Sequence, residues 1–322
     1  MLSTLMVVLP IFALIFAGWL VRRCDVLGDG ATAELNRYVV HLALPALLFD
    51  VTSHTHAAEI WQPGFIAVFG LSSLIVFAAT VAFRLRRPLP LADAAIDGLN
   101  AAYANTGFMG FPLALVALGP AALAPTTIAA IMTVCVVFAV AIVLIEIGTQ
   151  GQAQARGQAQ ARGQGRRAGL VRTVARSLLR NPLLIAPALG ALVPLSGASV
   201  PAPAETFLKL LGGSAAPCAL VALGLFLARP RTAAAPPAAA TALLVGLKLV
   251  AHPLLAYGLA RAFGLPPLLL HTAVLMAALP TGTGPFMLAE YYRREAAVTS
   301  NVVLVSTVVS ILTVSGYLAA IR

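Results

Sequence analysis

Residues 100–112 read N-A-A-Y-A-N-T-G-F-M-G-F-P and lie inside a long apolar segment. The surrounding residues favour a membrane-spanning helix, but Gly107, Gly110 and Pro112 oppose a continuous one. Each glycine costs about 1 kcal/mol in a helix interior, and the proline lacks an N–H donor and clashes with the preceding turn. We therefore predict a helix that is broken inside the bilayer. Its exposed backbone groups must then be satisfied by protein or by a water-filled cavity.

The residues around this break fit an anion site. A second half-helix beginning near Pro112 would direct its positive end at the break. Asn105 and Thr106 add an amide and a hydroxyl at the same level, and helix N-termini of this kind bind anions. The alternative is a simple kink whose free backbone groups are satisfied by neighbouring helices.

A second stretch has the same pattern in the other half of the chain. Residues 279–289 read L-P-T-G-T-G-P-F-M-L-A, with Pro280 and Pro285 flanking residues 281–284. Two interrupted hydrophobic segments in corresponding positions indicate a midplane binding site in a secondary transporter built from inverted repeats. The pair of breaks is therefore more specific than either break alone.

The composition is typical of a polytopic membrane protein. Of the 322 residues, 60% are hydrophobic and 10% are charged, and the mean hydropathy is +0.94, whereas a soluble domain carries about 25% charged residues. The net charge of +10 does not indicate nucleic-acid binding, because the positive residues flank apolar segments instead of forming one basic face. The three cysteines have no metal-binding or redox spacing.

Apolar segments of about 20 residues, the length that crosses a bilayer, occur ten times. They lie near residues 2–21, 35–53, 64–83, 94–118, 121–148, 181–196, 205–227, 238–260, 268–290 and 299–320. If the N-terminus is outside, the inside loops hold 17 of the 21 lysines and arginines, Lys209, Arg261 and Arg322 fall outside, and Lys248 lies within a span. This distribution supports both the number of spans and an orientation with both termini outside.

A basic, low-complexity segment separates the fifth and sixth spans. It repeats G-Q-A-Q-A-R at residues 151–162 and has nothing apolar to bury, so we expect it to be disordered. Five spans precede it and five follow, so the second half is inverted relative to the first. We therefore predict an all-α fold with a first five-helix repeat at residues 1–148, a cytoplasmic linker at 149–180 and a second repeat at 181–322. The broken helices are helices 4 and 9.

Two ionisable residues within the spans are candidates for a functional role. Lys248 lies near the middle of the eighth span, where it could offset the negative C-terminal ends of the half-helices or face a substrate carboxylate. The alternative is a lysine that snorkels to the membrane surface. Asp97 follows Asp93 by one turn, and we expect a hydrated carboxylate stabilised by the helix dipole, with titration during transport as the alternative. His54 and His56 lack a third metal ligand, so we expect no metal or cofactor.

These residues together resemble the auxin efflux carrier family, which includes plant auxin carriers and bacterial malate or malonate permeases. The matching stretches are L-N-R-Y-V-V-H-L-A-L-P-A-L-L-F at 35–49, A-N-T-G-F-M-G-F-P-L at 104–113 and L-P-T-G-T-G-P-F-M-L-A at 279–289. The resemblance extends over the whole chain in the order of the spans and is looser in spans six to eight. The plant carriers have a glutamine where Thr281 stands, so the bacterial permease branch is the better match.

The resemblance implies a scaffold made of spans 1, 2, 6 and 7 and a mobile transport unit made of spans 3–5 and 8–10, in which the two broken helices cross. A homodimer through the scaffold helices is compatible with it. It places the substrate near Asn105, Pro112, Pro280 and Pro285. The full predicted substrate site combines both breaks: Asn105, Thr106, Gly107, Gly110, Pro112, Pro280, Thr281, Gly282, Thr283 and Pro285. Lys248 and Asp97 are the candidates for ion coupling or charge compensation.

The leading functional hypothesis is a secondary carrier of small organic anions, such as mono- or dicarboxylates, that works by alternating access. We expect it in the plasma membrane, a bacterial inner membrane, with the anion and the lipid bilayer as its partners. One alternative is a sodium/proton exchanger or sodium-coupled carrier of a related crossing-helix fold, and another is a non-transporting membrane sensor of the same ligand. The sequence has no P-loop and no Gly-x-Ser-x-Gly motif, which disfavours ATP-driven transport and an enzyme.

Overall fold

The computed structural model describes residues 2–54, 61–155, 179–228, 238–294 and 296–321, and within them every regular element is helical. The first half contains α1 (Leu2–Arg23), α2 (Ala31–Tyr38), η1 (Val39–Ala43), α3 (Leu44–Ser53), α5 (Pro63–Arg84), α6 (Leu91–Ala102), η2 (Thr106–Gly110), α7 (Phe111–Leu118), η3 (Pro120–Ala122), α8 (Leu123–Ile131), η4 (Met132–Val137) and α9 (Phe138–Ala155). The second half contains α11 (Pro182–Leu195), α12 (Ala202–Gly213), α13 (Ala215–Leu227), α14 (Ala238–Gly246), η5 (Leu247–Ala251), α15 (His252–Ala262), α16 (Pro267–Ala278), α17 (Gly284–Tyr291) and α18 (Ala296–Ala320).

Among the described residues, five helical stretches are long and apolar enough to cross a membrane. They are Pro63–Arg84, Pro120–Thr149, Ala202–Leu227, Ala238–Ala262 and Ala296–Ala320. The other predicted spans coincide with α1, with α2 and α3 joined by η1, with α11, and with the interrupted pairs α6–α7 and α16–α17. Both predicted breaks are therefore present.

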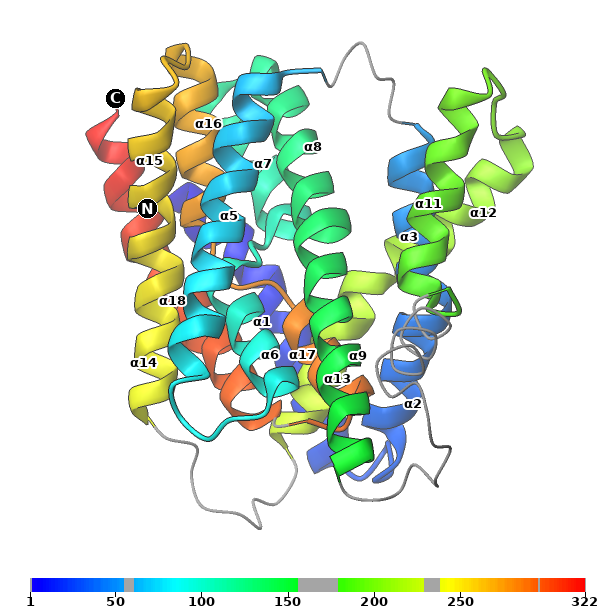
Figure 1. Cartoon of the computed structure of the whole chain (residues 1–322). Helices are drawn as coiled ribbons and strands as arrows, with labels where there is room; N and C mark the ends of the chain where they lie inside the picture. Colours follow the sequence, from blue (N-terminus) through cyan, green and yellow to red (C-terminus); the bar gives the residue numbers. More distant parts are fainter. Residues whose placement is uncertain (1, 55–60, 156–178, 229–237, 295, 322) are drawn as a thin grey trace, which may run out of the picture.

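The helices pack in two groups (Figure 1). In the first group, α3 packs against α11 and α12, while α13 packs against α1 and α2. The second group contains α5 to α9 and α14 to α18 and is joined by pairs such as α5–α6, α6–α9 and α15–α16. In Figure 1, α3, α11 and α12 stand to one side of α5, α8 and α9. The two groups coincide with the helices that the resemblance assigns to a scaffold and to a transport unit.

Glycines allow the closest helix contact within the first group. A Cβ at Gly18 of α1 would overlap the backbone of Val221, and one at Gly224 of α13 would overlap the backbone of Ile15. Helices in a lipid environment associate largely through such close packing of small residues. The two glycines therefore explain why α1 and α13, which are far apart in the sequence, lie side by side.

Helix α9 extends further than the sequence analysis predicts. It continues to Ala155, so residues 149–155 belong to a helix, and the disorder expected from residue 151 is wrong for residues 151–155. Alanine and glutamine are good helix formers, and they prolong α9 beyond its apolar part. The next residues of the predicted linker, 156–178, lie outside the described part of the chain.

The two interrupted segments form the most enclosed part of the molecule. Residues 94–102 of α6 and 272–278 of α16 are all buried. Both stretches are rich in alanine and carry few polar residues on any face, as expected of a helix that is surrounded by protein. The breaks that follow Ala102 and Ala278 consequently lie in the interior.

Candidate functional site

The two breaks meet and satisfy each other's backbone groups. Asn105 N donates a hydrogen bond to Pro280 O at 2.9 Å, and Gly282 N donates to Tyr103 O at 3.1 Å. These bonds form an isolated antiparallel bridge between Ala104 and Thr281. Since unpaired backbone groups are costly within a membrane, each interrupted helix supplies the partners that the other one lacks.

Thr281 closes the end of the opposite half-helix. Its hydroxyl donates to Asn100 O in the last turn of α6 at 2.7 Å, and its own N–H donates to Ser306 Oγ of α18 at 3.1 Å. The Asn100 amide in turn donates to Thr299 Oγ1 at 3.0 Å. These hydrogen bonds hold the two breaks together. Thr281 is completely buried, so it is not available to a ligand.

Glycines at the second break make room for the Tyr103 ring. A Cβ at Gly282 would lie 2.8 Å from Tyr103 Cε1, and one at Gly284 would lie 2.7 Å from Cζ. The same ring packs against Phe138, with the ring centroids 5.5 Å apart. The glycines of the second break are therefore required by packing.

The second half-helix of the first break begins earlier than predicted. Helical turns start at Thr106 in η2 and continue into α7, whereas the sequence analysis placed the start near Pro112. The five residues of η2 form a wider π-helical turn, and such turns are frequent at functional sites. Pro112 then lies six residues after this start, in the first turn of α7, where its missing N–H removes one backbone hydrogen bond from the helix. The positive helix end consequently lies at Asn105 and Thr106.

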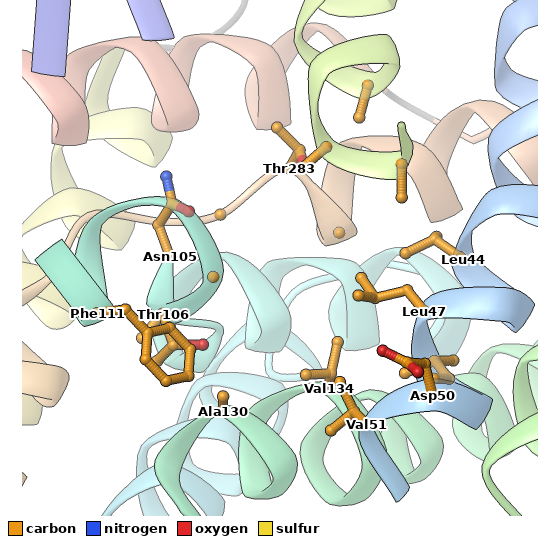
Figure 2. A pocket seen from close by; sticks show the side chains of 18 of the residues that line it. Leu44, Leu47, Asp50, Val51, Asn105, Thr106, Phe111, Ala130, Val134 and Thr283 are labelled. Atoms are coloured by element: carbon orange, nitrogen blue, oxygen red, sulfur yellow. The ribbon is translucent and has the colours of Figure 1, made fainter. Parts of the chain in front are cut away.

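A cavity of about 630 Å³ borders both breaks. Of the predicted substrate residues, five line it: Asn105, Thr106, Gly107, Gly282 and Thr283. Figure 2 shows Asn105, Thr106 and Phe111 on one side and Leu44, Leu47 and Asp50 of α3 on the other. The cavity therefore lies between the two groups of helices, and most of its remaining lining is apolar.

The other five predicted residues do not line this cavity. They are Gly110, Pro112, Pro280, Thr281 and Pro285. Pro112 and Pro285 lie in the first turns of α7 and α17, and a Cβ at Gly110 would lie 3.1 Å from Met276 Sδ. These residues shape the breaks, while the cavity is formed by their neighbours.

The polar side chains of the two breaks that line the cavity have no hydrogen-bond partner among the described residues. In the described part of the chain, the Asn105 amide makes no capping hydrogen bond, and none is made by the Thr283 hydroxyl. The Thr106 hydroxyl is likewise without a hydrogen bond there. Asn105 and Thr106 are 9% and 3% exposed. Buried polar groups are nearly always hydrogen-bonded, so this wall of the cavity is suited to a polar ligand.

Lys248 lies at the end of a half-helix and not in the cavity. It is completely buried, and its Nζ donates to Ala277 O in the last turn of α16 at 2.6 Å. This geometry excludes the snorkelling alternative and favours compensation of the negative helix end. Lys248 does not line the cavity, so the geometry gives no support to a direct contact with substrate there.

Asp97 is not the hydrated carboxylate that the sequence analysis predicts. Arg84 Nε, in the last turn of α5, donates to Asp97 Oδ2 at 2.6 Å, and the Asp97 side chain is 9% exposed. Asp93, one turn earlier, pairs with Arg294 at 3.2 Å. The prediction was wrong because the turn between α5 and α6 brings Arg84 over a carboxylate of the next helix, 13 residues further along the chain. Asp97 is not among the residues that line the cavity.

The wall opposite the breaks carries charged residues that the sequence analysis did not assign to the site. Asp50, His54 and Lys209 line the cavity. His54 lies with its Nε2 3.4 Å from Glu205 Oε1, and the same carboxylate pairs with Lys209. The available signal was the spacing, because Asp50 and His54, like Glu205 and Lys209, lie one helical turn apart. Their meeting depends on the packing of α12 against α3.

A family model described as membrane transport protein matches residues 3–318, nearly the whole chain. The chain belongs to this family. Together with its membrane-length apolar helices, membership makes the protein a multi-pass membrane transporter.

Relatives of the chain include bacterial, archaeal and plant members of the family. A protein of Rhizobium meliloti (strain 1021), whose name assigns it provisionally to malonate transport, is 34% identical over 98% of this chain and 95% of its own length. An uncharacterised transporter of Methanothermobacter thermautotrophicus is 26% identical over 95% of this chain and 94% of its own. Auxin efflux carrier component 3a of Oryza sativa subsp. japonica is 30% identical over 43% of this chain and 23% of its own. The predicted resemblance to the auxin efflux carriers is confirmed.

Proposed function

We propose that this transporter is a secondary carrier of small organic anions that works by alternating access. The observation that carries the proposal is the set of unpartnered polar groups at the first break. The Asn105 amide and the Thr106 hydroxyl face the cavity at the positive end of a helix. N–H and O–H donors beside a helix N-terminus favour a carboxylate. Malonate is the first substrate to test, because a relative that matches nearly the full chain carries its name.

The proposed architecture is ten transmembrane helices in two inverted five-helix repeats, at residues 1–148 and 181–322 around a linker at 149–180. Each half has a long helix, then an interrupted pair, then a long helix: α5, α6–α7 and α8–α9 in the first, α14–α15, α16–α17 and α18 in the second. The antiparallel bridge between the breaks supports the inversion, because two segments related by an axis in the membrane plane run in opposite directions.

The proposed movement is that of the second group of helices against the first. The cavity lies between α3 and α13 on one side and the breaks on the other. A substrate held by Asn105, Thr106 and Thr283 would move with the breaks and be exposed to each side of the membrane in turn. The apolar side chains exposed on α11, such as Leu189 and Leu192, would contact lipid or a second copy of the chain.

The proposed location is the plasma membrane, with both termini outside. Support comes from the loop charges, because the inside loops then hold most of the lysines and arginines. In Figure 1, the C-terminus lies at the opposite end of the molecule from the last turn of α9, as this orientation requires. Asp50 and Lys209 would then lie toward the outer side of the cavity.

The test is transport by the purified protein in proteoliposomes. Vesicles loaded with unlabelled malonate should take up external radiolabelled malonate by counterflow, and other mono- and dicarboxylates should compete for it. Empty liposomes and vesicles without internal malonate are the controls. Saturable binding without counterflow would contradict a carrier and support a ligand sensor. The absence of both for every organic acid tested would contradict the anion site itself.

A further inference from the structure

The helix end at the second break is contacted by a cation of the protein itself, the ammonium of Lys248. Lys248 Nζ donates to Ala277 O at 2.6 Å, and Ala277 lies in the last turn of α16, whose final carbonyls have no following helical N–H groups. The N–H of Thr281, four residues further on, donates instead to Ser306 Oγ. The Lys248 ammonium therefore supplies the hydrogen bond that the broken helix lacks.

Two further buried residues hold the ammonium in this position. His252 Nδ1 lies 3.2 Å from Lys248 Nζ, and His252 Nε2 lies 3.2 Å from Ser73 Oγ of α5. An ammonium can only donate, so Nδ1 accepts from Lys248 and the proton of the ring is on Nε2. Lys248, His252 and Ser73 are all completely buried. The lysine is thereby directed at the end of α16 by helices α5 and α15.

The corresponding end of the first break is satisfied without a charge. In the last turn of α6, Asn100 O accepts from the neutral Thr281 hydroxyl at 2.7 Å. The positive charge is therefore specific to the α16 end and is not a general requirement for closing a broken helix in this protein.

The end of a broken helix is the kind of place where carriers bind a coupling cation. A helix C-terminus carries a partial negative charge, and the carbonyls of interrupted helices coordinate sodium or protons in secondary transporters. At the end of α16, the Lys248 ammonium supplies the positive charge that a bound cation would supply, and it donates a hydrogen bond to a carbonyl oxygen.

We propose that Lys248 occupies the position of a coupling cation, so that anion transport by this protein requires no co-transported metal cation. His252 and Ser73 are positioning residues for the ammonium. The inference rests on the proposed carrier function, and it makes the sodium-coupled alternative unnecessary.

Replacement of Lys248 by residues of different size tests the proposal. Lys248→Ala removes the charge and leaves space, whereas Lys248→Met removes the charge and fills the space. Arg261→Met, which removes an exposed cation from α15, is the control. Radiolabelled malonate counterflow is measured in choline, sodium and methylammonium chloride, and the thermal midpoint of each purified variant is measured in the same salts.

The parent and the Arg261→Met variant should transport malonate equally well in all three salts. Lys248→Ala should lose about tenfold or more of the rate in choline and regain most of it in sodium or methylammonium. Lys248→Met should stay inactive in every salt. Sodium and methylammonium should also raise the thermal midpoint of Lys248→Ala, but not that of the parent or of Lys248→Met.

Three results would overturn the inference. They are a parent that needs sodium, a Lys248→Ala variant that is fully active in choline, and a folded Lys248→Ala variant to which neither cation restores activity or stability. A parent that transports none of the organic acids would instead refute the proposed function. The thermal midpoints would still report in that case whether a cation replaces the ammonium.

Discussion

The two breaks of this transporter have similar backbones and different side-chain chemistry. At the first break, the side chains of Asn105 and Thr106 face the cavity and have no hydrogen-bond partner in the described part of the chain. At the second break, Thr281 is completely buried and bonded to Asn100 O and Ser306 Oγ. The backbone hydrogen bonds between the breaks are reciprocal, because each break supplies one donor and one acceptor. The side chains of Asn105 and Thr106 thus leave the first break open to a ligand, whereas the second break is closed at Thr281 and lines the cavity through Thr283.

This difference indicates that one break binds the substrate and the other stabilises the pair of broken helices. A pair of broken helices needs an internal support as well as a binding surface, since every backbone group must find a partner inside the membrane. The second break supplies the support through Thr281, its glycines and Lys248. The first break is then free to present polar groups to the substrate. Substitutions at each break can show whether binding and support are separated in this way.

The largest effect is expected at the open break. Asn105→Asp keeps the size of the side chain and adds a negative charge beside a helix N-terminus, which tolerates it well. An anionic substrate would now meet a like charge in a partly desolvated site, at a cost of several kcal/mol. We expect malonate counterflow to fall about 100-fold or more. Asn105→Ala, which only removes the amide, should lose about tenfold.

The control for this change is Asn301→Asp, which adds the same charge on α18 outside the cavity lining. It should transport as the parent does. If Asn105→Asp folds, as judged by its thermal midpoint, and still transports anions normally, the first break is not the anion site.

The next prediction compares two threonines. Thr281→Val removes the hydroxyl that caps the end of α6 and leaves Asn100 O unsatisfied, so we expect a loss of stability of about 1–3 kcal/mol. Thr106→Val removes a hydroxyl that bonds to no described residue and should leave the stability nearly unchanged. Their effects on malonate affinity should be reversed, with Thr106→Val weakening binding several-fold. Thermal unfolding and binding titrations of the two variants measure this difference, and equal losses of stability would contradict it.

Much of this arrangement could be predicted from the sequence. The interruptions after Ala102 and Ala278 follow from glycine and proline in apolar segments, because such residues are incompatible with a continuous helix. The membrane class follows from the composition, and the transporter class from the pair of interruptions. The contact of Lys248 with a helix end is one of the alternatives that its place in the span leaves open. These features depend on local preferences or on the order of the segments along the chain.

The remaining features depend on contacts between distant segments. The burial of Asp97 requires Arg84 to fold over α6, and the exposure of Lys209 to the cavity requires α12 to pack on α3. The start of the half-helix at Thr106 depends on a π-helical turn that absorbs two glycines ahead of Pro112. The sequence alone does not distinguish the roles of Asn105 and Thr281, because only the tertiary structure shows which of them is enclosed.

A smaller effect is expected at the wall opposite the breaks. Lys209 is the only lysine or arginine among the described residues that line the cavity, and it pairs with Glu205. Lys209→Gln should raise the KM for malonate about two- to fivefold, because an exposed charge contributes modestly to the capture of an anion. Glu205→Gln removes a competing carboxylate and should lower the KM. Uptake kinetics at low and high salt check both variants, and shifts in the same direction would contradict recognition by Lys209.

The smallest effect is expected at a glycine of the open break. A Cβ at Gly107 would meet no atom within 4 Å, whereas one at Gly282 would lie 2.8 Å from the Tyr103 ring. Alanine is the better helix former by about 1 kcal/mol, so Gly107→Ala should leave the stability unchanged or raise it by up to about that amount. Gly282→Ala must displace Tyr103 and should destabilise by about 1–3 kcal/mol. Thermal midpoints of the two purified variants measure the contrast. Similar losses in both would mean that the first break is packed as tightly as the second, and that its open face is not free to receive a ligand.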